Sequence, residues 1–133
     1  MNTLKISKIY LFIAGVILSI VGGLTTFTPV AIKANEGIQI AGNTSALNDV
    51  RAFGMLLLAT VLLLFLGIVK NALLKTAMLS SFLLFLSLGV GRLTSILLDG
   101  MPSDGIVKAT GLEFLLGLIG LFLFIANTKK QSF

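Results

Sequence analysis

Two ionisable residues, Arg92 and Glu113, stand well inside apolar segments of this chain. A guanidinium in hydrocarbon costs about 2.5 to 3.5 kcal/mol on insertion scales, so an arginine persists there only where a partner or a function holds it. Arg92 lies seven residues before Asp99, and Glu113 lies seven residues after Ile106; we expect Asp99 and Ile106 to mark the outer ends of two consecutive helices. The helical rise then places both side chains on the order of 10 Å below the outer membrane surface. Matched depth and opposite charge predict an ion pair with the bidentate geometry that arginine offers to a carboxylate.

Further polar residues lie close to this expected pair. Arg92, Ser95 and Asp99 are spaced i, i+3 and i+7, so they share one helical face, and Arg51 is expected to enter the membrane at the same outer end. Together with Glu113 they predict a polar pocket that opens outward. Such a network can fix helix register, bind the head group of a lipid, quinone or other amphiphile, or move protons through Glu113. The alternatives stay open, and we favour the structural role.

The residue types that the chain lacks narrow its chemistry. It contains no cysteine, histidine or tryptophan, which excludes disulfides, thiol chemistry and histidine-ligated metal or haem. The five carboxylates are the groups available for acid–base catalysis. The sequence shows no nucleophile with an adjacent base. We therefore expect no catalytic residue, no metal site and no cofactor.

The composition indicates that the solvent of this chain is a lipid bilayer. Hydrophobic residues make up 56% and charged residues 11%, and the mean hydropathy is +1.08, whereas soluble domains hold about 25% charged residues. The length of 133 residues fits one domain. The formal net charge of +5 comes from basic residues in short flanks that orient helices, so we expect no nucleic-acid partner.

Four apolar segments are long enough to cross a hydrocarbon core of about 30 Å: 9–28, 47–69, 76–98 and 106–126. We expect an all-α membrane protein, with residues 1–133 forming a single four-span transmembrane bundle in up-down-up-down order. Short links make the second, third and fourth spans antiparallel neighbours. A cleaved signal peptide is the alternative for the first segment, and we disfavour it because the apolar run is long and no small-residue cleavage site follows.

Outside the spans, the polar stretch 29–43 is punctuated by proline and glycine and predicts a loop, with a short extended piece around Ile38 to Ile40. Thr44 or Ser45 is expected to cap the second span. Tyr10 is expected at the cytoplasmic interface, where the tyrosine ring is favourable.

Small residues predict where helices approach closely. In the first span Gly15, Ser19 and Gly23 recur every four residues, and in the fourth span Gly117 and Gly120 form a similar face. We expect both faces to pack against neighbouring helices, either within the chain or in a larger assembly.

Basic residues predict the orientation of the spans. The lysines of the expected cytoplasmic flanks are Lys5, Lys8, Lys70, Lys75, Lys129 and Lys130. Because cytoplasmic flanks carry an excess of lysine and arginine, we expect both termini in the cytoplasm.

The chain also resembles a known family, and three features carry the resemblance. They are Arg51-Ala-Phe-Gly54 opening the second span, Gly91-Arg92-Leu-Thr-Ser95 with Asp99-Gly-Met-Pro102 closing the third, and Glu113 in the fourth. On these features, and over nearly its whole length, the chain resembles small four-helix bacterial membrane proteins known only as a domain of unknown function, similar in layout to the DoxX-like group.

The resemblance implies a protein of the bacterial inner membrane without an established activity. By analogy with DoxX-like relatives it implies an accessory role. The expected partners are membrane lipids and, as alternatives, a larger membrane complex, a second copy of the chain or an amphiphilic ligand.

Overall fold

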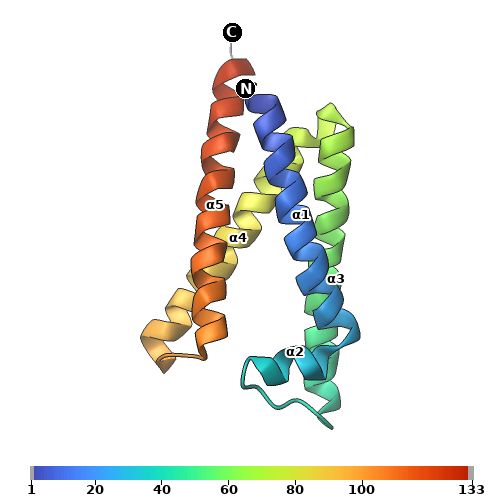
Figure 1. Cartoon of the computed structure of the whole chain (residues 1–133), viewed down its shortest axis with the longest axis vertical. Coiled ribbons are helices and arrows are strands. Elements are labelled where there is room, and N and C mark those ends of the chain that lie inside the picture. Colours follow the sequence, from blue (N-terminus) through green and yellow to red (C-terminus); the bar gives the residue numbers. More distant parts are fainter. Residues whose placement is uncertain (1, 132–133) are drawn as a thin grey trace.

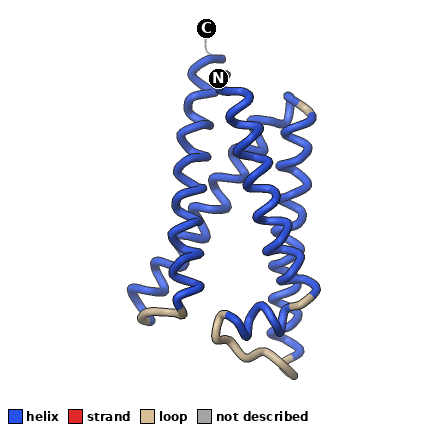
Figure 2. The backbone as a smooth tube through the Cα atoms, viewed as in Figure 1, coloured by secondary structure: helices blue, strands red, loops and turns tan. Residues whose placement is uncertain are grey.

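The computed structural model describes residues 2–131, and over that range every regular element is a helix (Figures 1 and 2). The four long helices are α1 (Thr3–Phe27), α3 (Thr44–Val69), α4 (Asn71–Asp99) and α5 (Asp104–Gln131), and the short α2 (Pro29–Asn35) lies between α1 and α3. By length and composition all four long helices are able to cross a membrane. The prediction of an all-α chain with four apolar helices is confirmed.

The helices extend past the apolar segments at several ends. Asn2 caps α1 through its side chain, so α1 begins well before the apolar run. Helix α4 begins at Asn71, which places Lys75 inside the helix and leaves Lys70 alone between α3 and α4. Hydropathy marks only the part of a helix that lies in hydrocarbon, whereas the backbone hydrogen bonds continue into the polar interface.

The polar stretch between α1 and α3 differs from the prediction. Residues Pro29–Asn35 form α2 where a loop was expected, because proline at the first helical position lacks only an N–H that has no helical partner. Residues 38–40 are irregular and are not part of a strand. Asn43, rather than Thr44 or Ser45, caps α3, and its side chain accepts a backbone N–H of the first turn at 3.0 Å.

Figure 1 shows both chain ends at one end of the bundle and α2 at the other. Helix α1 packs most extensively against α3, and α4 against α5; the contacts between α3 and α4 and between α1 and α5 join these two pairs. At the end that carries α2, the α1–α3 and α4–α5 pairs lie apart (Figure 1). A site built on α4 and α5 at this end is therefore separate from one built on α1 and α3.

The core is a continuous cluster contributed by all four long helices. Its fully buried side chains include Leu11 from α1, Leu57 and Leu64 from α3 and Met78 from α4. Large apolar side chains such as Leu62 and Phe122 are exposed on the outer faces. A helix that buries one face and exposes apolar groups on the other is suited to a lipid surrounding.

Candidate functional site

The predicted pair of Arg92 and Glu113 is present and joins α4 to α5. Arg92 Nε donates to both carboxylate oxygens of Glu113, at 3.1 Å from Oε1 and 3.0 Å from Oε2. The Glu113 side chain is 11% exposed and that of Arg92 is 30% exposed. The geometry differs from the expected two-nitrogen fork, because one nitrogen serves both oxygens. The terminal nitrogens of the guanidinium, which carry four of its five N–H groups, take no part in this pair.

Small residues bring the two helices close enough for this pair to form. A Cβ atom added at Gly89 would lie 3.1 Å from the ring of Phe114, and one added at Gly117 would lie 3.1 Å from the backbone nitrogen of Leu86. Both contacts lie between α4 and α5. Compared with the ion pair, they are nearer the end of the bundle that carries the start of α1 and the end of α5. The prediction that Gly117 lies in a close helix contact agrees with this packing.

Ser95 and Asp99 form a separate local contact. The Ser95 hydroxyl donates to Asp99 Oδ2 at 2.8 Å, one turn along α4, and both residues are exposed. The hydrogen bonds of Arg92 go to Glu113 instead. The polar face predicted on α4 therefore exists, but it divides into a local Ser95–Asp99 contact and the interhelical pair.

Arg51 lies away from the pair, which corrects the expectation of one pocket with four charges. Its guanidinium donates to the backbone carbonyl of Thr26 in the last turn of α1. The last carbonyls of a helix have no partner inside the helix, so a nearby arginine binds them favourably. Arg51 also lines a cavity of about 410 Å³ beside α2, which no residue of the Arg92 pair lines.

The small-residue face predicted on α1 is only partly used. Gly15 packs against Phe65 of α3, since a Cβ atom there would lie 2.8 Å from the ring. The Ser19 hydroxyl donates to the carbonyl of Gly15 within its own helix, at 2.7 Å. Gly23 faces open space in this chain, so its packing against a helix of a larger assembly stays a prediction.

The close contact between α1 and α3 that the prediction missed is made by Gly22 and Gly54. A Cβ atom added at Gly54 would lie 3.0 Å from the carbonyl oxygen of Gly22 and 2.8 Å from the backbone nitrogen of Thr26. Gly54 belongs to the Arg51-Ala-Phe-Gly54 segment that opens α3. The arginine and the glycine of this segment thus both contact the end of α1.

Tyr10 is a buried polar residue that the sequence analysis placed at the membrane interface. Tyr10 is only 5% exposed. Its hydroxyl lies 2.9 Å from Ser81 Oγ and donates to the carbonyl of Leu116 at 3.0 Å. Gly120 leaves room for this hydroxyl, since a Cβ atom there would collide with it. Ser81 lies inside an apolar span, where a polar side chain needs a hydrogen-bond partner. Its depth in the membrane, estimated as for Arg92, was the signal that could have predicted a partner on another helix.

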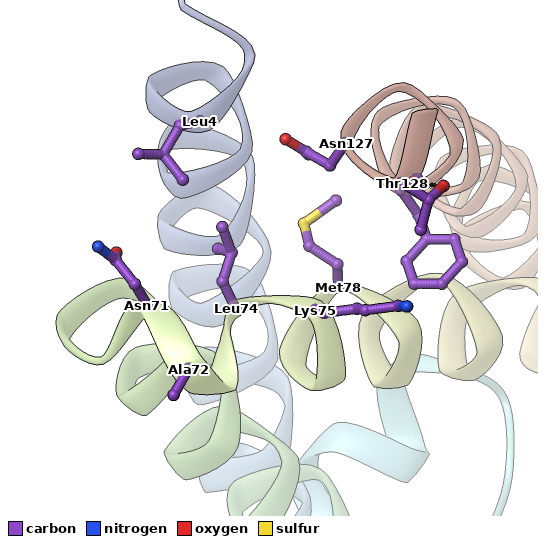
Figure 3. Close-up of a pocket in the computed structure, with 9 residues that line it drawn as sticks. Leu4, Asn71, Ala72, Leu74, Lys75, Met78, Asn127 and Thr128 are labelled. Atoms are coloured by element: carbon purple, nitrogen blue, oxygen red, sulfur yellow. Dashed lines mark hydrogen bonds between the residues drawn. The ribbon is translucent and has the colours of Figure 1, made fainter. Parts of the chain in front are cut away.

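One cavity lies at the end of the bundle that carries the start of α1 and the end of α5, whereas the sequence predicted a pocket at the other end. The cavity measures about 450 Å³ and is lined by residues of α1, α4 and α5 (Figure 3). None of the five residues of the predicted pocket lines it. Sequence reasoning missed this cavity because its walls come from helix ends that are far apart in the chain.

Comparison with known proteins identifies a family. Residues 6–124 match the model of a family described as "Domain of unknown function (DUF4345)". No curated protein and no solved structure matches the chain.

Proposed function

We propose, from the premise that this chain belongs to the DUF4345 family, that it is a multi-pass protein of the bacterial inner membrane acting as an accessory subunit of a larger membrane assembly. The expectation of a domain-of-unknown-function family is confirmed, but the family itself assigns no chemistry. The role proposed is structural rather than catalytic. The observation that carries the proposal is the partly engaged guanidinium of Arg92.

Arg92 uses one nitrogen for Glu113 and leaves its two terminal nitrogens outside the pair. Its side chain is 30% exposed within a helix that is long and apolar enough to cross a membrane. Polar groups in such a place require acceptors, because hydrocarbon offers none. A neighbouring membrane protein with a carboxylate or an unpaired carbonyl at that depth supplies them. The pair then joins α4 to α5 and also presents donors to a partner.

The surface around Arg92 suits such a partner. Leu88 and Ile96 lie one turn before and one turn after Arg92 on the same face of α4, and both are half-buried, so apolar side chains flank Arg92 along the helix. Gly91 faces open space. A central charged group surrounded by apolar contacts is a common arrangement at interfaces, where it gives specificity as well as affinity.

The orientation belongs to the same proposal. Both chain ends lie at one end of the bundle (Figure 1), together with Lys5, Lys70 and Lys75. We place this end in the cytoplasm, with the helices crossing in up-down-up-down order. A reporter that is active only in the cytoplasm should be active when fused to the C-terminus and inactive when inserted near Gly42. Activity at both places would contradict this topology.

The accessory role is tested by purification from the native membrane in a mild detergent, followed by mass spectrometry of the retained proteins and lipids. We expect a stoichiometric protein partner with the native chain and its loss with Arg92→Lys. Lysine keeps a positive charge for Glu113 but lacks the planar fork of donors. Arg51→Lys is the matched control, because Arg51 lies on α3 and bonds to α1, and it should keep the partner. Equal retention by both variants would contradict a role for Arg92 in docking.

A second candidate function uses the same observation. The terminal nitrogens of Arg92, which make no hydrogen bond within residues 2–131, also suit the head group of an amphiphile, such as a lipid or a quinone, that enters from the outer side. Arg51 does not join such a site, because it bonds to α1. Purification that retains a small molecule, without a protein partner, would favour this function. Proton transport through Glu113 has less support, because both of its carboxylate oxygens accept from Arg92.

A further inference from the structure

The cavity at the terminal end of the bundle is a second site, independent of Arg92. Its walls are mainly apolar and include Leu4 of α1, Leu74 and Met78 of α4, and Phe124 of α5. Figure 3 shows Leu4, Leu74 and Met78 beside the space between the three helices. A volume of about 450 Å³ lies within the usual range of small-molecule sites, about 300 to 1,000 Å³.

Polar residues also line this space: Asn71, Lys75, Asn127 and Thr128. Lys75 and Asn127 come from different helices. Lys75 projects from α4 (Figure 3), and within residues 2–131 no hydrogen bond or ion pair holds its ammonium group. Asn127 reaches from α5 toward α1, where its Nδ2 donates to Ser7 Oγ at 2.7 Å and to the carbonyl of Leu123 at 2.8 Å. These bonds fix the carboxamide and leave its oxygen as an acceptor. The cavity thus combines apolar walls with polar groups that include one cation and one fixed acceptor.

The charge around the cavity is positive. The aspartate and glutamate side chains of the chain lie elsewhere, four of them at the end that carries α2 and one inside α5: Glu36, Asp49, Asp99, Asp104 and Glu113. Lys5 and Lys70 lie at the same end as Lys75. The N-terminus of α4, which lines the cavity with Asn71, has no side-chain cap, so its dipole adds to the positive potential. The site therefore favours an anion.

We propose that this cavity binds an anionic phospholipid, with an acyl chain between the apolar walls and the phosphate at Lys75. The first turns of α1 and α4 and the last turns of α5 surround the cavity, at the ends of membrane-spanning helices. The head groups of lipids lie at this level. A hydroxyl group on the head group, as in phosphatidylglycerol, can donate to the oxygen of Asn127. The orientation proposed above assigns this lipid to the cytoplasmic leaflet, but the chemistry of the site does not depend on that orientation.

A soluble anion fits this site less well than a lipid. Leu4, Leu74, Met78 and Phe124 offer no polar group to a small hydrophilic ion, and they gain from burial against an acyl chain. Conversely, a neutral apolar ligand leaves Lys75 without a counter-charge. An amphiphile with one negative charge satisfies both parts of the site.

The test is a lipid titration of the delipidated protein in mild detergent, read by native mass spectrometry. Phosphatidylglycerol and phosphatidylcholine with identical acyl chains are the two probes. We expect tighter binding of phosphatidylglycerol, and we expect Lys75→Gln to weaken it by about fivefold, as one basic residue contributes at an anionic surface. Lys5→Gln is the matched control; it removes the same charge at the same end, but Lys5 does not line the cavity.

A second variant tests the apolar part of the site. Leu4 lines the cavity from the first turn of α1 and is half-buried, so Leu4→Trp places a larger apolar side chain at the space without changing a fully buried residue. We expect this variant to keep its helical circular dichroism and thermal midpoint while losing binding of both lipids by tenfold or more. Unchanged binding by Leu4→Trp would overturn the proposal. So would equal losses in Lys75→Gln and Lys5→Gln, which would show attraction by net charge only.

Discussion

Replacement of either Arg92 or Glu113 by leucine is expected to destabilise the detergent-solubilised protein by about 3 to 5 kcal/mol, the usual cost of leaving one member of a buried ion pair alone. The Glu113 side chain is 11% exposed and accepts two hydrogen bonds from Arg92, so it has little access to another donor in the chain. Loss of helical circular dichroism on heating measures the effect. The midpoint should fall strongly in both variants.

Asp99→Asn is the control for this experiment. Asp99 is exposed and accepts from Ser95 within its own helix, so its replacement should change the free energy of unfolding by less than about 0.5 kcal/mol. A loss in Asp99→Asn as large as in Arg92→Leu would mean that Arg92 depends on the whole polar face of α4 rather than on Glu113.

A methyl group at Gly54 is expected to have the second largest effect. In Gly54→Ala the new Cβ atom would lie 2.8 Å from the backbone nitrogen of Thr26 and 3.0 Å from the carbonyl oxygen of Gly22. Backbone atoms cannot rotate away as side chains do, so α1 and α3 must separate. Overpacking of this kind costs about 1 to 3 kcal/mol. The thermal midpoint should fall, and the bond from Arg51 to the Thr26 carbonyl should weaken with it.

Gly23→Ala is the matched control for Gly54→Ala. Gly23 lies in α1 one residue after Gly22 but faces open space. Alanine is a better helix former than glycine by about 1 kcal/mol, so this variant should be as stable as the native chain or more stable. An equal loss in both variants would show that glycine is needed for a reason other than the α1–α3 contact.

The predictions that held rest on fixed distances along a helix. The four long helices follow from hydropathy, because only a helix of about 20 apolar residues spans a bilayer with all its backbone groups paired. The pair of Arg92 and Glu113 follows from equal depth on two helices joined by a short turn. Both arguments need only the helical rise and the order of the segments along the chain.

The contacts that the sequence analysis missed or misplaced depend on the rotation and crossing of helices. Gly15, Ser19 and Gly23 are spaced by four residues, which turns the face by about 40° at each step and by about 80° from Gly15 to Gly23. Gly22 is seven residues from Gly15, close to two full turns, and therefore stays on the face toward α3. The partner of Arg51 likewise depends on how α1 and α3 cross. Hydropathy contains no information on that crossing.

Tyr10 and the terminal cavity show a further limit. The hydroxyl of Tyr10 finds its partners 71 and 106 residues away along the chain, and the cavity forms only where the ends of α1, α4 and α5 meet. An interfacial position for tyrosine is common, and a single sequence gives no reason to expect a buried one. Such contacts follow from tertiary packing, which residue patterns along one helix do not specify.

The most direct measurement of the central claim is the thermal midpoint of the double variant Arg92→Leu/Glu113→Leu beside the two single variants. If the two side chains are joined as the structure shows, the double variant leaves no buried charge alone and should recover much of the stability that each single variant loses. Losses that add in the double variant would contradict the claim, since they would show that Arg92 and Glu113 do not act on each other.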